Sequence, residues 1–217
     1  MSELAYHILE LEIACDRNDP RRVAPVLRDQ YKCILDIGCG AGQTLIACDL
    51  SPGVFSCGVD IDEEALTLGR RLSQRIAFVQ ASGERLPFPD RSFEVVISRL
   101  SLPYMHLPGA LREIARVLRP EGQIWFTLHP ISMVFQNIAK SLKGWNAKHL
   151  AYQFYVLANG LSLHLTGKQF RFPFNRDKCE SFQTVGGIVR AMRAVGFDQV
   201  RTYRGELFVV TASKQGE

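Results

Sequence analysis

Glycines and carboxylates follow the first two apolar strands expected from the sequence, in a pattern suited to binding a nucleoside. Segment 34–44, ILDIGCGAGQT, places glycines at 38, 40 and 42 between a strand and a helix. Glycine has no Cβ, so the backbone can turn sharply there and lie against a ligand. Asp36 lies two residues before the first glycine, close enough to pair with an ammonium group.

A second carboxylate, Asp60, ends the next expected strand. At that position it can accept hydrogen bonds from both hydroxyls of a ribose. Dinucleotide sites favour the spacing G-x-G-x-x-G, with a helix N-terminus facing a pyrophosphate. Here the spacing is G-x-G-x-G with an acid ahead of it. The pattern therefore favours a nucleoside with an amino-acid tail and no phosphate, and disfavours a nicotinamide-dependent dehydrogenase.

The elements that position these residues alternate between short apolar runs and segments of helical period, which predicts a parallel sheet flanked by helices. Asp62 is expected to cap the second of these helices. The expected strands are 32–37, 54–60, 75–80, 93–98, 123–129, 197–203 and 206–212, and the expected helices are 43–50, 62–72, 108–118 and 182–195. Turns are expected at 120–122 and at Arg204-Gly205. The predicted fold is α/β: a Rossmann-like, mostly parallel seven-stranded sheet with helices on both faces and a C-terminal antiparallel hairpin.

A length of 217 residues is consistent with one domain. We expect four parts within it: an N-terminal helical segment at 1–30, a cofactor-binding core at 31–129, a substrate-cap insertion at 130–180, and a last helix with the β-hairpin at 181–213.

Composition narrows the functional class. The net charge of +4 is mildly basic and falls short of a nucleic-acid-binding footprint, so nucleic acid is not expected as a partner. The first 20 residues alternate apolar and acidic residues, unlike a signal peptide, and no apolar run has the length of a membrane span. The six cysteines form no CxxC pair, which disfavours disulfides and zinc. We expect a cytoplasmic protein with no metal site and a small-molecule substrate.

Four stretches of the sequence together resemble class I S-adenosylmethionine-dependent methyltransferases, and within them the small-molecule and quinone-biosynthesis methyltransferase family. They are LDIGCGAGQT, GVDIDEEAL, GERLPFPDRSF at 83–93 and ALREIARVLRPEG at 110–122. The likeness spans about 34–129 and 181–213. It implies methyl transfer by in-line displacement, with S-adenosyl-L-methionine as cofactor and no catalytic nucleophile.

The resemblance also implies a set of cofactor-binding residues. The glycines would line the methionine part, Asp60 would hold the ribose, loop 82–85 would border the adenine, and residues 98–100 would lie beneath the sulfonium. The expected set is Asp36, Gly38, Cys39, Gly40, Gly42, Gln43, Asp60, Ile61, Ser82, Gly83, Glu84 and Ser98. One position departs from the family: Ser82 stands where an acid usually binds the adenine amino group, and an uncharged hydroxyl accepts a weaker hydrogen bond.

Three residues beside later strand ends are candidates for handling the acceptor. His106 follows the fourth strand and could act as the base if the acceptor is a hydroxyl. The alternative is that it caps the helix beginning at Pro108. His129 ends the fifth strand and could contact the acceptor or serve as a hydrogen-bonded structural residue. Tyr104 could border the acceptor or simply pack.

Segment 130–180 has no clean period but holds eight aromatic residues and seven Lys or Arg. Because it follows the fifth strand, it could fold over the pocket, with Tyr152, Tyr155 and Phe172 forming an apolar acceptor chamber. These aromatics could instead form a satellite core, or stack on RNA bases. The favoured function is methyl transfer to a small aromatic or lipid-like acceptor; the alternatives are an RNA methyltransferase and a non-catalytic S-adenosylmethionine-binding regulatory protein.

Overall fold

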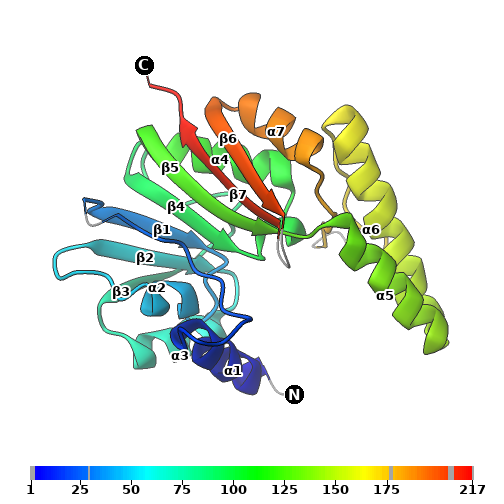
Figure 1. Cartoon of the computed structure of the whole chain (residues 1–217), viewed down its shortest axis with the longest axis horizontal. Helices are drawn as coiled ribbons and strands as arrows, with labels where there is room; N and C mark the ends of the chain where they lie inside the picture. The colour runs from blue at the N-terminus through cyan, green and yellow to red at the C-terminus, as the bar shows by residue number, and fades with distance from the viewer. Residues whose placement is uncertain (1–2, 29, 176–177, 205–207, 217) are drawn as a thin grey trace.

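The computed structural model of the chain describes residues 3–28, 30–175, 178–204 and 208–216, which form layers of helices around a central sheet (Figure 1). The strands are β1 (Cys33–Ile37), β2 (Phe55–Asp60), β3 (Ile76–Gln80), β4 (Phe93–Arg99), β5 (Leu118–Leu128), β6 (Phe197–Arg204) and β7 (Phe208–Lys214). The helices are α1 (Glu3–Cys15), α2 (Gln43–Ala47), α3 (Glu63–Leu72), α4 (Leu107–Val117), α5 (Ile131–Lys143), α6 (Ala147–Thr166) and α7 (Val185–Arg193), with a short 3₁₀ helix, η1 (Leu102–Tyr104).

The sheet has the strand order β3-β2-β1-β4-β5-β7-β6. Strands β1 to β5 are parallel, and β7 is antiparallel to both β5 and β6. This confirms the predicted mostly parallel seven-stranded sheet with a C-terminal antiparallel hairpin. The predicted turn residue Gly205 and the predicted strand start at Glu206 lie outside the described residues. Strand order reverses between β1 and β4, and ligands bind at such a switch point in open α/β sheets.

Both faces of the central strands are covered by helices. On one face, Leu35 of β1 belongs to the same buried cluster as Leu111 of α4 and Met192 of α7. On the other face, Ile34 of β1 packs in a cluster with Leu45 of α2. Burial on both sides explains why β1 is apolar at four of its five positions, Asp36 excepted, rather than alternating apolar and polar residues. It also confirms helices on both faces of the sheet.

The turn between β2 and α3 is held by the helix cap that the sequence predicts. The Asp62 side chain accepts hydrogen bonds from the backbone N–H groups of Glu64 at 2.9 Å and Ala65 at 3.2 Å. Such a cap satisfies two of the N–H groups left unpaired at a helix start. It fixes the path of the chain directly after Asp60.

The sequence of segment 130–180 shows no clean hydrophobic period, yet the segment contains two long helices. α5 and α6 pack against each other and extend from the end of β5 as an arm beside the sheet (Figure 1). The missing period has a physical cause. The exposed face of α6 carries residues such as Phe154 and Leu161, and its buried face carries Tyr155 and Leu163. Apolar residues on both faces leave no contrast for a 3.6-residue pattern to show.

Two further expectations need correction. The N-terminal helix ends at Cys15, well before residue 30, and the chain beyond it contains Pro20 and Pro25, which cannot donate a backbone hydrogen bond. The expected turn at 120–122 lies inside β5, which begins at Leu118. At these residues the register of β5 against β4 shifts, and Glu121 adopts a φ of 61°. The residues expected to form a turn therefore form an irregularity within β5.

Asp36 is a predicted site residue that lies inside the sheet layer. Its side chain is only 1% exposed and does not line the cavity described below. Both carboxyl oxygens lack a hydrogen-bond partner among the described residues. The expectation that Asp36 pairs with an ammonium group therefore finds no support in this structure, because the residue is part of β1, is buried and does not line the cavity. Burial raises its pKa to about 8, an effect that the Arg99 charge opposes and the Asp60 charge reinforces.

We predict that Asp36→Asn stabilises the ligand-free protein increasingly as the pH rises. A pKa raised in the folded state means that wild-type stability falls from the ordinary carboxyl pKa near 3.8 up to the folded value of about 8. An amide at this position has no such dependence. Urea unfolding of both proteins at about pH 5 and about pH 9 measures the difference. Exposed Asp90→Asn is the control for surface charge. A stability gain that is the same at both pH values would contradict the prediction.

Candidate functional site

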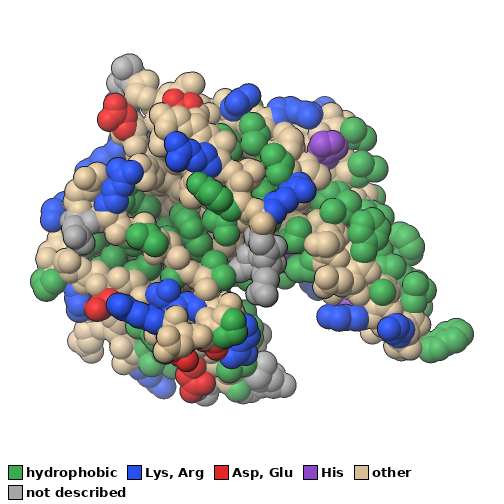
Figure 2. All heavy atoms as spheres, in the orientation of Figure 1, with side chains coloured by type: hydrophobic (Ala, Val, Ile, Leu, Met, Phe, Trp, Pro, Cys, Tyr) green, Lys and Arg blue, Asp and Glu red, His purple; other side chains and the backbone are tan. Residues whose placement is uncertain are grey.

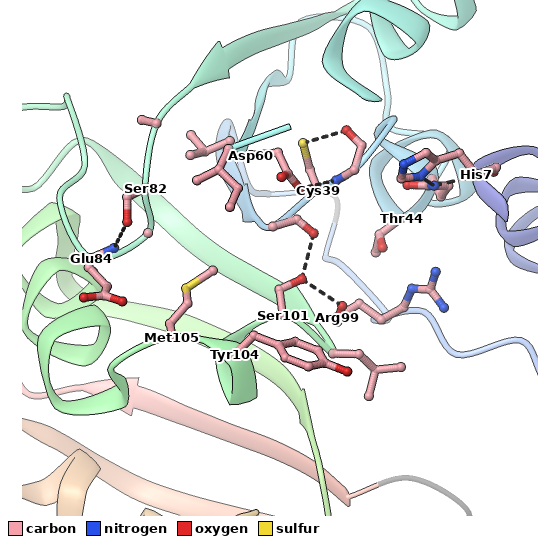
Figure 3. A pocket seen from close by; sticks show the side chains of 18 of the residues that line it. His7, Cys39, Thr44, Asp60, Ser82, Glu84, Arg99, Ser101, Tyr104 and Met105 are labelled. Atoms are coloured by element: carbon pink, nitrogen blue, oxygen red, sulfur yellow. Dashed lines mark hydrogen bonds between the residues drawn. The ribbon is translucent and has the colours of Figure 1, made fainter. Parts of the chain in front are cut away.

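A cavity of about 650 Å³ opens at the carboxyl ends of β1, β2 and β4, at the switch point of the sheet (Figure 3). Ligand pockets for small molecules fall in the range of about 300–1,000 Å³. The cavity is bordered by the glycine loop after β1, the end of β2, the loop after β3, and the segment from Arg99 to Met105 after β4. Nine predicted cofactor residues line it: Gly38, Cys39, Gly40, Gln43, Asp60, Ile61, Ser82, Gly83 and Glu84.

The first glycine of the loop is required by a close approach. Gly38 has a φ of 69°, and its N–H donates to the Val59 carbonyl at 2.7 Å. A Cβ at this position would lie 2.1 Å from the Cβ of Ser101, whose hydroxyl donates to the Gly38 carbonyl at 2.9 Å. The loop is thereby held against the segment after β4 (Figure 3).

Gly42 has a different role from the one expected, because it does not line the cavity. It precedes α2 with a φ of 82°, and a Cβ there would lie 2.8 Å from the ring of Phe78 on β3. The third glycine therefore allows α2 to begin close against the sheet, which is a packing role.

The Asp60 carboxylate is fixed by two backbone donors. Gly40 N–H donates to one oxygen at 2.8 Å, and Asp62 N–H donates to the other at 3.0 Å. Each carboxylate oxygen can accept more than one hydrogen bond, so acceptor capacity remains for a ligand in the cavity. This arrangement joins the glycine loop to the end of β2 and suits a carboxylate that accepts from the two hydroxyls of a ribose.

The loop after β3 presents a carboxylate to the cavity even though Ser82 replaces the family's usual acid. The Ser82 hydroxyl accepts from the N–H of Glu84 at 3.2 Å. One Glu84 oxygen accepts from the N–H of His106 at 2.9 Å, and the other pairs with the Arg171 guanidinium at 2.5 Å. Arg171 also lines the cavity, so a chain segment far from Glu84 in sequence closes this side.

Helix α1 contributes residues that the sequence alone did not indicate. Tyr6 and His7 line the cavity, and α1 packs on α2. His7 Nδ1 lies 2.9 Å from the amide nitrogen of Gln43. Arg99, at the end of β4, lines the cavity and pairs with Glu10 of α1 at 2.5 Å. The contact of α1 with the glycine loop is tertiary, so no local sequence signal marks it.

On the other side of the cavity, Tyr104 and His129 lie edge to face, with ring centroids 5.0 Å apart. His129 is 4% exposed, and burial lowers its pKa to about 4. Its Nδ1 lies 3.8 Å from a Glu180 oxygen, beyond hydrogen-bonding distance, and the other Glu180 oxygen accepts from the Tyr152 hydroxyl at 2.7 Å. His129 is therefore a neutral imidazole, able to accept a proton at the cavity wall.

Two other predicted residues lie away from the cavity. The side chain of His106 accepts a hydrogen bond from the N–H of Gly109 at 3.2 Å and caps α4, which is the alternative interpretation of this residue. The Ser98 hydroxyl is fully buried and donates to the Ile37 carbonyl at 2.8 Å. Neither residue lines the cavity.

The aromatic residues expected to form an acceptor chamber also lie outside the cavity. Tyr155 and Phe182 are buried in one cluster, against which Tyr152 and Phe172 pack. The Tyr155 hydroxyl donates to the Phe170 carbonyl at 2.9 Å. This is the satellite-core alternative: the aromatics hold the arm together and do not fold over the site.

The described part of the chain offers no group of three or more His, Cys, Asp or Glu side chains that could hold a metal ion. Nor does any described helix combine the length and apolarity that crossing a bilayer requires. Three pairs of ionisable side chains line the cavity: the carboxylates of Asp60 and Glu84, the guanidinium groups of Arg99 and Arg171, and the imidazoles of His7 and His129.

Comparisons with known proteins agree with this geometry. The family model described as "Methyltransferase domain" matches residues 35–126. An uncharacterized methyltransferase of Bacillus subtilis is 37% identical over 103 residues, covering 44% of this chain and 40% of that protein. A fatty-acid O-methyltransferase of Mycolicibacterium smegmatis is 34% identical, covering 44% and 36%, and a demethylmenaquinone methyltransferase of Chlorobaculum tepidum is 33% identical, covering 41% and 37%. The chain spans less than half the length of these curated relatives.

Solved structures share the fold at lower sequence identity. A structure of S-adenosylmethionine-dependent methyltransferases from Methanosarcina mazei has a TM-score of 0.59 at 22% identity, covering 88% of this chain and 96% of that one. A putative S-adenosylmethionine-dependent methyltransferase from Listeria monocytogenes has a TM-score of 0.60 at 20% identity, covering 98% and 99%. Residues 35–126 thus match a methyltransferase-domain model, and the chain shares the fold of solved S-adenosylmethionine-dependent methyltransferases.

Proposed function

We propose that the chain is an S-adenosylmethionine-dependent methyltransferase that methylates a hydroxyl group of a small aromatic or lipid-like acceptor. The observation that carries the proposal is the Asp60 carboxylate, fixed by the N–H groups of Gly40 and Asp62 on the wall of a 650 Å³ cavity. The proposal treats the chain as a single domain, with residues 31–129 as its cofactor-binding core.

The groups around the cavity fit the parts of the cofactor. Asp60 offers acceptors to the ribose hydroxyls, and Arg99 offers a guanidinium to the methionine carboxylate. The glycine loop leaves backbone exposed beside them. Glu84 provides a carboxylate near the expected adenine position, which offsets the replacement of an acid by Ser82. When bound, S-adenosylmethionine supplies a methyl group on a positively charged sulfonium, which is already activated for transfer.

The acceptor side is the wall formed by Tyr104 and His129. A hydroxyl becomes a better nucleophile as a base removes its proton, and His129 is the imidazole on this wall of the cavity. The other cavity-lining imidazole, His7, lies on α1 and contacts the Gln43 amide. The low pKa of His129 keeps it in the neutral form at neutral pH, and also makes it a weaker base than an ordinary histidine. The role proposed for His129 replaces the one that sequence spacing indicated for His106, which is occupied as a helix cap.

The acceptor class rests on the relatives and on the shape of this wall. The names of two relatives describe O-methylation of a fatty acid and methylation of demethylmenaquinone. The edge of an aromatic ring at Tyr104 suits a flat or apolar acceptor. We propose that the segment after α6, through Arg171, borders the acceptor, because Arg171 reaches the cavity and the helices of the arm do not.

The first test is cofactor binding. We predict that Asp60→Ala weakens S-adenosylmethionine binding by about 10- to 100-fold, because hydrogen bonds to a charged acceptor contribute ~1.5–3 kcal/mol. Isothermal titration calorimetry measures the affinity, with NAD as the ligand control. Exposed Asp90→Ala is the matched variant and is expected to bind normally. An Asp60→Ala protein that binds as tightly as wild type would remove the basis of the proposal.

The second test is turnover, measured as S-adenosylhomocysteine released with a panel of phenols, quinols and long-chain alcohols. We predict that His129→Asn lowers kcat by about 10²-fold, the lower end of the usual contribution of a general base, because its low pKa makes it a weak base. S-adenosylmethionine affinity should be retained, which also shows that the variant is folded. His149→Asn, on the arm and away from the cavity, is the matched control.

The pH dependence separates His129 from an ordinary histidine. Because its pKa in the ligand-free protein is lowered to about 4, wild-type kcat/KM should show no histidine ionisation near pH 6.5 and should fall only as the pH approaches 4. Unchanged turnover in His129→Asn would exclude His129 as the base. If the wild type turned over none of the acceptors, the alternative of a non-catalytic S-adenosylmethionine-binding protein would be favoured.

A further inference from the structure

One face of α6 is apolar along its whole length and is exposed. Six residues make up this α6 stripe, and each is exposed: Ala147, Ala151, Phe154, Ala158, Leu161 and Leu165. Phe154, Leu161 and Leu165 have 54%, 49% and 63% of their surface accessible. In Figure 2 hydrophobic side chains gather along the outer edge of the arm, over α6.

The chain itself leaves this face uncovered, because α6 packs on the arm through its opposite side. Gln153, Tyr155, Val156 and Leu163 are buried, and Gly160 allows contact with Phe182. From residue 149 to 166 the helix carries no Lys, Arg, Asp or Glu. A helix face that meets only water is normally polar or charged, so an uncharged apolar face indicates a partner.

The spacing of the α6 stripe indicates that the partner is another helix. Successive stripe residues are four, three, four, three and four positions apart. This is the 3.5-residue repeat by which two helices pack along a common seam. Helices that bind a membrane surface carry Lys or Arg along the sides of the apolar stripe, whereas α6 has only Lys148, at its start.

The sizes of the stripe residues match those of the same stripe reversed end to end. Reversal places Ala147 opposite Leu165, Ala151 opposite Leu161, and Phe154 opposite Ala158, so each level pairs a small residue with a large one. Parallel alignment would place alanine against alanine and phenylalanine against phenylalanine, leaving gaps at some levels and crowding others. We infer that α6 pairs antiparallel with α6 of a second copy of this chain, through the α6 stripe.

Charge supports the antiparallel direction. The two Lys148 side chains would lie at opposite ends of the paired helices, separated by roughly 25 Å at ~1.5 Å per residue. Antiparallel helices also place each positive N-terminal dipole end near a negative C-terminal one. The contact is isologous and closed, as in most homodimers. The inference does not depend on the proposed enzymatic function, because its readout is association.

Sedimentation equilibrium of the full chain tests the pairing. The wild type should associate to a dimer as its concentration rises. Leu161→Lys buries an unpaired cation in the seam and should weaken the dimer by about 30-fold or more, the loss typical of a central interface residue. Leu161→Gln is a second variant should the charge disturb folding, and exposed Leu72→Lys is the matched control. Far-UV circular dichroism checks that each variant is folded.

A charge swap tests the direction. Combining Ala151→Glu with Leu161→Lys in one chain places opposite charges together at two levels of the antiparallel pair and should restore the dimer. In a parallel pair the same changes would bring like charges together. Failure of the double variant to regain dimerisation would overturn the antiparallel register. A wild type that stays monomeric at its highest soluble concentration, or one that instead binds phosphatidylglycerol vesicles, would overturn the inference.

Discussion

The geometry of the site depends on the carboxylate of Asp60. It accepts from Gly40 N–H in the loop after β1 and from Asp62 N–H at the start of α3. Two loops that follow different strands are thus joined by one side chain at the switch point of the sheet. The Asp62 cap holds the same turn from the other side. A ligand that binds Asp60 meets an acceptor whose position is already set, which lowers the conformational cost of binding.

Burial determines the protonation states of two side chains around the site. Asp36, beneath the glycine loop, has its pKa raised by burial, and His129, on the far wall, has its pKa lowered by the same cause. In both cases the neutral form is favoured, because a charge loses hydration in the interior. Of the charged groups that line the cavity, Arg99 pairs with Glu10 and Arg171 with Glu84, whereas Asp60 is held by backbone N–H groups. Opposite charges therefore neutralise each other at two places on the cavity wall, beside Arg99 and beside Arg171.

Much of the fold could be predicted because it rests on local patterns. Apolar runs of strand length, the glycine turn and the Asp62 cap each act over a few residues. The site was predictable at Gly38, Gly40 and Asp60, which lie at the ends of strands recognisable from the sequence and all line the cavity. Asp36 shows where prediction from the sequence fails. Its position two residues before the glycine loop does not reveal that it is still part of β1 and is buried there.

What the sequence could not show depends on contacts between distant segments. Tyr6 and His7 reach the cavity only because α1 packs on α2, and Arg171 reaches it from beyond the arm. Helix α6 of the arm was not predicted because it is apolar on both its buried and its exposed faces. The same property that hid the helix indicates its partner, since a second copy would bury the exposed face.

A crystal structure with bound S-adenosylhomocysteine tests the central claim most directly. The account predicts both ribose hydroxyls within about 2.6–3.2 Å of the Asp60 carboxylate oxygens, with the N–H groups of Gly40 and Asp62 still donating to them. A nucleoside seated elsewhere, or an Asp60 side chain turned away from the ligand, would contradict it.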